Sequence, residues 1–491
     1  MADVDRAEVA FNELVDELAS LEESNPTWLD IATRLLTFCH KFPPPSTAWD
    51  GLDSDEVWDA ILDLELSAAA DLRAVDAAFF APAPLSSASR EHVRALLATA
   101  KSALVPKPFG DTRLSLAVVA RALAGAIDNL AGSTYLTFFK SLGEMTIKEG
   151  EPYPVCSHDP CPWLPDRKAN TNPKNRPKRD LSFTPSLRIA TGPFGFTYVL
   201  DFNFWDRLSP LGTSSKGLVM AAAQTNFKLG DFDTKYAPSQ PGKLSKWYAN
   251  RGPRNDTQQV DRITRLIGAA MAEGAELVLM PEYAASESAY KTLDGLPGSD
   301  FPRVFCIGIS RPDTNDYVKN QAWLRVSTPG ISPSYSTHFH AKTSGAKLLG
   351  AITERIRLAS EIRVFVSQNW SLCVLICVEV LADGILEQLA KMGTNLLLVP
   401  AMSEKTNSMV ADVSTLCQDS QAFVVMANGP AEWWTEDGQD PPCEAFFAGP
   451  YGNAPSSWET RFRDAGRQPD QIAAWVLPVL QKTVSLHQLP R

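Results

Sequence analysis

Apolar positions in the first 148 residues recur at the three- and four-residue spacing of an α-helix. The segments that show this spacing are residues 9–21, 28–38, 57–72, 90–104 and 112–142. Such a series places the apolar side chains on one face of a helix, and helices bury these faces against one another. The pattern predicts a mainly helical N-terminal domain over residues 1–148.

The helical periodicity stops after residue 148, where proline and asparagine become frequent. Residues 167–179 contain six Lys or Arg side chains, and short extended patterns follow in residues 183–205. A segment of this composition is typical of an exposed loop or linker. We interpret residues 149–217 as a linker. Contact of its basic stretch with RNA, DNA or an acidic protein is the alternative.

From Leu218 onward, short apolar runs alternate with amphipathic segments. The apolar runs are residues 218–224, 277–282, 304–310, 371–380, 395–401 and 422–428. Helical periodicity separates the first two runs, at residues 257–272. Strands that alternate with helices indicate an α/β fold in which helices cover a sheet. The sequence therefore predicts an α/β domain over residues 218–491.

Composition and charge narrow the function classes. The chain has 491 residues, which is enough for two or three domains, and its net charge is −11. This charge disfavours broad nucleic-acid binding, which requires clustered Lys and Arg. The N-terminus does not resemble a secretory signal, and no apolar run reaches the ~18 residues that span a bilayer. Eight cysteines scattered over a long chain indicate reduced thiols, so we expect a cytoplasmic protein without membrane contact.

Three polar residues in the α/β domain lie within or directly after apolar segments. Glu282 ends the run LVLMPE, Lys342 follows HFHA, and Cys377 lies in SLCVLICVEV. Each residue alone has an ordinary explanation, as an exposed strand end, a solvated lysine or a buried, inert cysteine. Together they supply a thiol, an ammonium group and a carboxylate, which are the groups that nucleophilic catalysis by cysteine uses.

In this order and spacing, the three residues resemble the catalytic motifs of the nitrilase superfamily of carbon–nitrogen hydrolases. The motifs are Pro281–Glu282, His340–Ala341–Lys342 and Ile376–Cys377–Val378–Glu379, framed by Gln224 and residues 393–403 and 421–429. The resemblance covers residues 218–485. It implies an α-β-β-α sandwich with a Glu282, Lys342 and Cys377 triad, and it implies a homo-oligomer because family members pair through the sandwich.

The resemblance also implies a role for each residue. Lys342 would favour the Cys377 thiolate and, with the backbone N–H of Val378, stabilise the oxyanion that forms when the thiolate attacks an amide. Glu282 would take the proton from the thiol and return it to the departing amine. This chemistry needs neither a metal nor an organic cofactor.

Further site residues follow from the same motifs. The second glutamate of the family matches Glu354, with Glu361 as the alternative. Tyr283, Val378 and Glu379 are expected on the substrate side. A zinc site is a weaker hypothesis: Cys156, His158 and Cys161 would supply three ligands, but no second Cys/His pair lies nearby in the sequence. We therefore expect no metal site.

The chain departs from the family pattern at three places. Val378 stands where the family usually has Tyr or Trp, and Ala341 stands where Arg or Lys is common. The nucleophile strand begins Ser371–Leu372–Cys373, without the usual glycine. No catalytic group is lost, so we expect the family's chemistry with an unusual substrate pocket.

The expected activity is cleavage of a non-peptide carbon–nitrogen bond in a linear amide, carbamoyl compound or nitrile, through an acyl-enzyme on Cys377. An N-acyltransferase that uses the same triad is one alternative. Another is a regulated effector in bacterial defence or signalling, whose helical N-terminal domain binds a protein partner. The long N-terminal extension motivates this second alternative. A relative that only binds its ligand would not need the complete triad.

Overall fold

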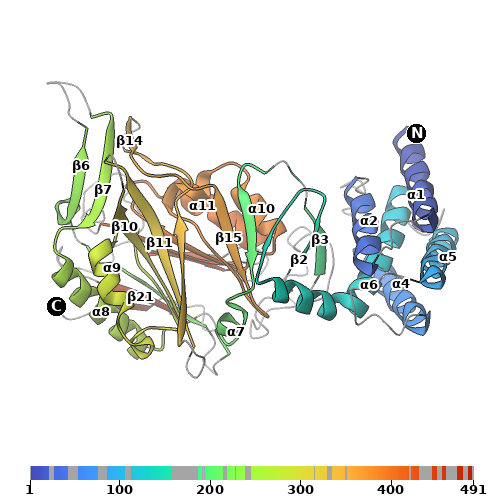
Figure 1. The fold of residues 1–491 in the computed structure, drawn as a ribbon, viewed down its shortest axis with the longest axis horizontal. Helices are drawn as coiled ribbons and strands as arrows, with labels where there is room; N and C mark the ends of the chain where they lie inside the picture. The colour runs from blue at the N-terminus through green and yellow to red at the C-terminus, as the bar shows by residue number, and fades with distance from the viewer. Residues whose placement is uncertain are drawn as a thin grey trace. The chain divides into compact units, whose positions relative to one another are not determined.

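A computed structural model gives the fold of the chain (Figure 1). It describes residues 2–20, 27–41, 54–75, 86–104, 112–155, 186–190, 192, 194–213, 218–226, 228–237, 245–313, 316–328, 334–348, 351–419, 422–430, 445–449, 456–460, 473–478 and 485–488. The cysteines and histidine of the zinc hypothesis and the basic stretch at 167–179 lie outside these ranges. The described residues form two compact units, one from residues up to 155 together with 186–194, the other from residue 195 onward.

The first unit is a helical bundle with short strands. Its elements are α1 (Ala2–Ser20), α2 (Trp28–Lys41), α4 (Ser54–Val75), α5 (Ser87–Leu104), α6 (Thr112–Leu142), β1 (Glu144–Thr146), β2 (Pro152–Val155) and β3 (Ser186–Ile189). Helix α6 contacts the other four helices, and its residues from Leu116 to Ile127 are buried almost without interruption. A helix that is apolar on all sides belongs at the centre of a bundle. The helical prediction for this region is confirmed.

Two large sheets form the second unit. The first has the order β4-β15-β16-β17-β18-β19-β20, and the second has the order β12-β11-β10-β8-β5-β21-β22. Strands of the first sheet are β4 (Thr197–Asp201), β15 (Glu361–Val366), β16 (Ser371–Val374), β17 (Leu396–Ala401), β18 (Phe423–Asn428), β19 (Ala445–Gly449) and β20 (Ser456–Thr460). Strands of the second are β5 (Val219–Ala223), β8 (Leu277–Leu279), β10 (Val304–Pro312), β11 (Val318–Ser327), β12 (Tyr335–Ala341), β21 (Ala473–Pro478) and β22 (Ser485–Gln488).

The two sheets face each other, and helices cover their outer sides. Strands β17 and β18 of the first sheet contact β8, β10 and β5 of the second. Helices α8 (Asp256–Ala272) and α9 (Glu287–Asp294) pack on the second sheet, and α11 (Asn407–Asp419) packs on β18 and β19 beside α10 (Ile385–Lys391) (Figure 1). Because each sheet is covered on both sides, strands such as β8 and β17 are buried throughout. The expected α-β-β-α sandwich is confirmed.

A smaller sheet adds to the sandwich near one end of these strands. Its order is β13 (Lys347–Leu348), β14 (Ile352–Glu354), β7 (Trp247–Pro253) and β6 (Phe232–Tyr236). Strand β7 runs parallel to β14 although about a hundred residues separate them in the chain. The remaining short elements are α7 (Trp205–Leu208), η2 (Leu229–Asp231), β9 (Ala285–Ser286), η3 (Gly298–Asp300) and η4 (Cys377–Leu381). Within the described ranges, each helix is too short or too polar to span a bilayer.

The structure corrects the strand predicted over residues 371–380. Strand β16 ends at Val374, and a 3₁₀ turn begins at Cys377. Cys377 has a φ of 53°, in the left-handed region, which ends the extended conformation there. The Glu379 side chain then accepts the backbone N–H of Ile376 and closes the turn. An apolar run alone does not reveal such a turn, because nearly all of its residues are buried in either case.

Extended segments also occur inside the region interpreted as a linker. Strand β4 pairs in parallel with β15, with Tyr198 opposite Ile362 and Leu200 opposite Val364. All four side chains are buried, which gives β4 a place in the sandwich ahead of Leu218. The described residues from 195 onward accordingly belong to the second unit.

Candidate active site

Glu282 reaches the site through a close backbone approach. Strand β8 ends at Leu279, and the N–H of Gly308 on β10 donates to the carbonyl of Pro281 at 3.0 Å. A Cβ atom on Gly308 would lie 2.4 Å from the Cα atom of Glu282, so only glycine permits this contact. The N–H of Glu282 donates to Ala401 of the facing sheet at 3.3 Å. The Glu282 carboxylate is thus held, almost fully buried, between the two sheets.

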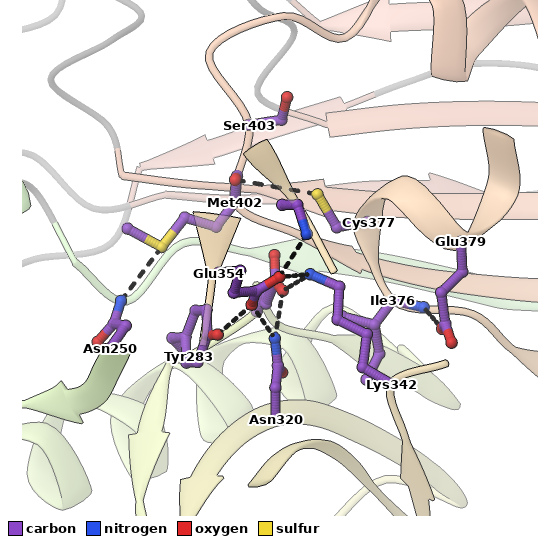
Figure 2. Close-up of polar contacts among 12 residues, drawn as sticks. Asn250, Tyr283, Asn320, Lys342, Glu354, Ile376, Cys377, Glu379, Met402 and Ser403 are labelled. Atoms are coloured by element: carbon purple, nitrogen blue, oxygen red, sulfur yellow. Dashed lines mark hydrogen bonds and ion pairs between the residues drawn. The ribbon is translucent and has the colours of Figure 1, made fainter. Parts of the chain in front are cut away.

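Lys342 lies at the centre of the site. It directly follows strand β12, and its N–H donates to the Asn320 carbonyl on β11 at 2.9 Å. Its Nζ atom donates to Oε2 of Glu354 at 2.8 Å (Figure 2). It also donates to Oε1 of Glu282 at 2.7 Å. The lysine side chain is fully buried. One ammonium group therefore joins two buried carboxylates and offsets one of their two negative charges.

A network of neutral donors completes the coordination of the two carboxylates. The Asn320 Nδ2 atom donates to Glu282 at 2.6 Å and to Glu354 at 2.9 Å. The Tyr283 hydroxyl and the backbone N–H of Ala346, at 2.7 Å, donate to Glu354 as well. Figure 2 shows Tyr283 and Asn320 beside Glu354. Asn320 was not predicted from the sequence; it is a buried amide in the mixed polar and apolar strand β11, next to a second amide, Gln321.

Cys377 presents its thiol beside this network. It is 1 % exposed, and its sulfur donates weakly to the Met402 carbonyl at 3.9 Å. Burial raises the pKa of the Cys377 thiol well above its ordinary value, and the nearby Glu282 carboxylate raises it further, while Lys342 opposes this shift. These directions favour the protonated thiol in the free enzyme, because burial and the Glu282 carboxylate outweigh the Lys342 ammonium group.

The pKa values of Glu282 and Glu354 shift in opposite directions, although both carboxylates contact Lys342. Burial and the neighbouring Glu354 hold the pKa of Glu282 above its ordinary value despite the attraction of Lys342. Burial acts on Glu354 in the same direction, but the charge of Lys342 and the hydrogen bonds from Lys342, Tyr283 and Ala346 bring its pKa below the ordinary value. A carboxylate with a raised pKa is the better proton acceptor. This difference favours Glu282 as the base and Glu354 as a permanent counter-ion.

Glu379 connects the lysine segment, residues 340–343, to the turn that begins at Cys377. Its carboxylate accepts hydrogen bonds from the Thr343 hydroxyl at 2.6 Å and from the backbone N–H groups of Thr343 and Ile376, and it pairs with His340 Nε2 at 2.8 Å. The side chain is fully buried. Because its oxygens are occupied by protein groups, we interpret Glu379 as a positioning residue rather than the substrate contact expected from sequence.

Replacing Glu379 with glutamine is expected to lower kcat by about 10- to 100-fold with little change in KM. The glutamine keeps the size of the side chain but turns one acceptor into a donor, which faces groups that already donate. The turn at Cys377 and the lysine segment would then lose the hydrogen bonds that hold them to the same side chain. Steady-state kinetics on the best amide substrate measures both constants, and Glu361→Gln, at a half-exposed glutamate, is the matched control. A raised KM with unchanged kcat would instead restore the substrate-contact role.

The other two expected substrate residues occupy different places. Tyr283 is buried, with a φ of 60°, and its hydroxyl is committed to Glu354. Val378 directly follows the nucleophile and is partly exposed. Glu354, rather than Glu361, lies against Lys342. Among the described residues, no group of three or more His, Cys, Asp or Glu side chains is arranged to hold a metal ion.

Comparison with known proteins gives structural similarity only. No family model matches the chain, and no curated protein matches it. A solved structure of an amidase from Nesterenkonia sp. AN1, with the acetamide moiety of fluoroacetamide added covalently at its active-site cysteine, has 15% identity and a TM-score of 0.35. It covers 50% of this chain and 92% of its own. The same amidase in complex with butyramide has 15% identity and a TM-score of 0.34, covering 50% and 91%.

Glutamine-dependent NAD+ synthetase from Acinetobacter baumannii is also similar, with 13% identity and a TM-score of 0.36. It covers 56% of this chain and 48% of its own. The Nesterenkonia amidase is described as a nitrilase-superfamily protein, the family whose motifs this chain resembles. The second unit has a nitrilase-like fold of two facing sheets, and Glu282 and Lys342 meet between them beside Cys377.

Proposed function

We propose that this nitrilase-like domain is a thiol-dependent hydrolase that cleaves the carbon–nitrogen bond of a small, non-peptide amide through an acyl-enzyme on Cys377. The observation that carries the proposal is the enclosed cluster in which Lys342 binds both Glu282 and Glu354 beside the thiol. Linear amides are the first choice, ahead of carbamoyl compounds and nitriles. The cluster contains a nucleophile, a base and a cation, which are the groups that acyl transfer requires.

Acylation begins with proton transfer from the Cys377 thiol to the Glu282 carboxylate as the sulfur attacks the amide carbon. The carbonyl π electrons move to oxygen and form a tetrahedral oxyanion. The Lys342 ammonium group and the Val378 backbone N–H stabilise this charge, and loss of one such donor typically costs about 10²- to 10³-fold in rate. Collapse of the intermediate breaks the carbon–nitrogen bond. The amine leaves with the proton that Glu282 had taken, and a thioester remains on Cys377.

Deacylation repeats the sequence with water as the nucleophile. Glu282, again a carboxylate, removes a proton from the water while the water oxygen attacks the thioester carbon. The second tetrahedral intermediate expels the sulfur of Cys377, which recovers the proton from Glu282. The products are a carboxylic acid and the free thiol. Glu354 keeps its negative charge throughout and holds Lys342 in place, in keeping with its lowered pKa.

Ammonia release across a panel of linear amides, carbamoyl compounds and nitriles tests the proposal. Turnover is expected for at least one amide, together with an acyl adduct on Cys377 in the intact mass of enzyme quenched during turnover. Hydroxylamine added to the reaction captures the thioester as a hydroxamate, and release of the free carboxylic acid when water is the only acceptor distinguishes hydrolysis from acyl transfer. A thiol that neither turns over the panel nor reacts with haloacetamides would contradict the proposal.

Alkylation of Cys377 by iodoacetamide is expected to become easier in the Glu282→Gln variant. The negative charge of Glu282 raises the pKa of the thiol, so its removal lowers that pKa and increases the thiolate fraction at a given pH. Labelling at pH 8 should be roughly tenfold faster, while amide turnover is lost. Peptide mass spectrometry over a pH series gives the rate at Cys377. Glu387→Gln, at an exposed glutamate on α10, is the control, and slower labelling in Glu282→Gln would contradict the assignment.

A further inference from the structure

Tyr248 is the direct neighbour of Glu354 in the small sheet. Strand β7 pairs in parallel with β14, with Tyr248 opposite Glu354, and the Arg355 N–H donates to the Tyr248 carbonyl at 2.7 Å. Side chains of directly paired residues lie on the same face of a sheet, and successive residues alternate between faces. Because the Glu354 side chain binds Lys342, the Tyr248 side chain points toward the catalytic groups as well.

Contacts on the opposite face of the β7–β14 pair stabilise this register. The Arg355 guanidinium lies over the Trp247 ring at 4.3 Å and over the Tyr317 ring at 4.6 Å. Trp247 and Arg355 each adjoin a member of the Tyr248–Glu354 pair, so they occupy the face turned away from the site. Cation–π stacking of this kind stabilises the pairing from the side that takes no part in chemistry.

The charges of the site also act on the Tyr248 phenol. Burial raises the pKa of Tyr248, the charges of Glu354, Glu282 and Cys377 raise it further, and Lys342 lowers it. These influences agree with the strand pairing, which puts Tyr248 on the same face of the sheet as Glu354. The phenol stays protonated near neutral pH, which makes it a hydrogen-bond donor.

Tyr248 differs from the other site residues in its exposure and in its free hydroxyl. The catalytic cysteine, lysine and glutamates are buried, whereas Tyr248 is only half-buried. In the described part of the chain, the Tyr248 hydroxyl has no hydrogen-bond partner. The polar atoms that are fully enclosed by protein and lack a partner do not include this hydroxyl, so it is open to solvent. The Tyr283 hydroxyl, by contrast, is bound to Glu354. Tyr248 thus offers a donor at the boundary between the catalytic cluster and solvent.

We infer that Tyr248 is a specificity-determining residue whose hydroxyl donates a hydrogen bond to the acyl chain of the substrate. The inference rests on the proposed amide hydrolysis and narrows its substrate class to amides with an acceptor oxygen and no negative charge on the acyl chain. The acceptor follows from the donor character of the phenol. The exclusion of a negative charge follows from Glu282 and Glu354, whose two carboxylates outnumber the single Lys342 ammonium group and repel an anionic acyl chain.

Matched amide pairs that differ in one oxygen test the inference. Methoxyacetamide and butyramide have the same chain length, as do 3-methoxypropanamide and pentanamide, and only the ethers carry an acceptor. Wild-type enzyme is expected to prefer one ether over its alkane partner by about 2- to 10-fold in kcat/KM. Tyr248→Phe removes only the hydroxyl and should abolish this preference. Acetamide, which has no acyl acceptor, should keep its kcat within about twofold.

Tyr236→Phe is the matched control, because Tyr236 lies on strand β6 of the same small sheet and is exposed. This variant should keep the ether preference. A preference that persists in Tyr248→Phe overturns the inference, as does a loss of more than about 100-fold in kcat for acetamide, which would make the phenol a catalytic donor.

A binding measurement separates this inference from the reaction itself. Calorimetric titration of the amide pairs into Cys377→Ala, with and without Tyr248→Phe, requires no turnover. Tighter binding of an ether that disappears in the double variant supports the inference even when the panel shows no hydrolysis. Equal binding of ether and alkane in Cys377→Ala overturns it, while turnover of either amide by wild-type enzyme leaves the proposed function intact.

Discussion

Turnover is expected to fall roughly 10⁴- to 10⁶-fold when Cys377 is replaced by alanine, because no other group in the cluster can carry the acyl intermediate. Alanine removes the sulfur without adding a new contact, and both residues tolerate the observed φ of 53° about equally. The free energy of unfolding should therefore change by only about 1–2 kcal/mol. Ammonia release at saturating amide measures the first effect, and denaturant unfolding measures the second.

Cys373→Ala is the matched control for this loss. Cys373 lies on strand β16, four residues earlier, and is also a fully buried thiol with a raised pKa. Its sulfur donates only to the neighbouring Val374 carbonyl. The variant should keep its activity, and the acyl adduct should remain on Cys377. Residual turnover of Cys377→Ala near the wild-type rate would show that the nucleophile lies elsewhere.

Replacing Lys342 with methionine is expected to lower both activity and stability. The substitution leaves Glu282 and Glu354 buried and facing each other without the ammonium group that both contact at less than 3 Å. Removal of one partner from a buried ion pair typically costs about 3–5 kcal/mol of stability. Activity should fall by at least about 10²- to 10³-fold, because the oxyanion loses its cationic donor.

The loss of stability in the Lys342→Met variant is expected to depend on pH. Without the lysine, both carboxyl pKa values rise above the unfolded-state values, so protonation stabilises the folded variant. Its stability deficit relative to wild type should therefore be largest near pH 8 and shrink as the pH falls toward 5. Adding Glu282→Gln and Glu354→Gln removes the unpaired charges and should restore stability without restoring activity. A deficit that grows toward acidic pH would contradict the ion-pair account.

Motifs in the sequence located the groups that carry the proposed chemistry but not the groups that hold them in place. The order of the motifs along the chain identified four residues near strand ends: Glu282, Lys342, Glu354 and Cys377. Asn320 was missed because β11 mixes polar and apolar residues, and one of its two amides resembles any other polar residue until its two carboxylate partners are known. Tyr248 was missed for a related reason, since its neighbour Glu354 lies more than a hundred residues away in sequence.

The sequence by itself determined the local structure and the order of the motifs. Helical spacing in the first 148 residues and apolar runs after Leu218 indicate the two structural classes, because these periodicities follow from the geometry of one helix or one strand. Tertiary structure decided the rest. The Lys342 contact with Glu282 spans 60 residues, and the Glu379 contact with His340 spans 39.

Such contacts depend on which strands become neighbours and in which register, and the free energy that selects them comes from burial of the whole sandwich core. The same burial acts on the thiol. The residue types supply a lysine that favours the thiolate and a glutamate that can take its proton, whereas burial in the folded site raises the pKa of both the Cys377 thiol and Glu282. The protonation state of a buried group is set by desolvation and by every charge around it, and these are defined only once the chain has folded.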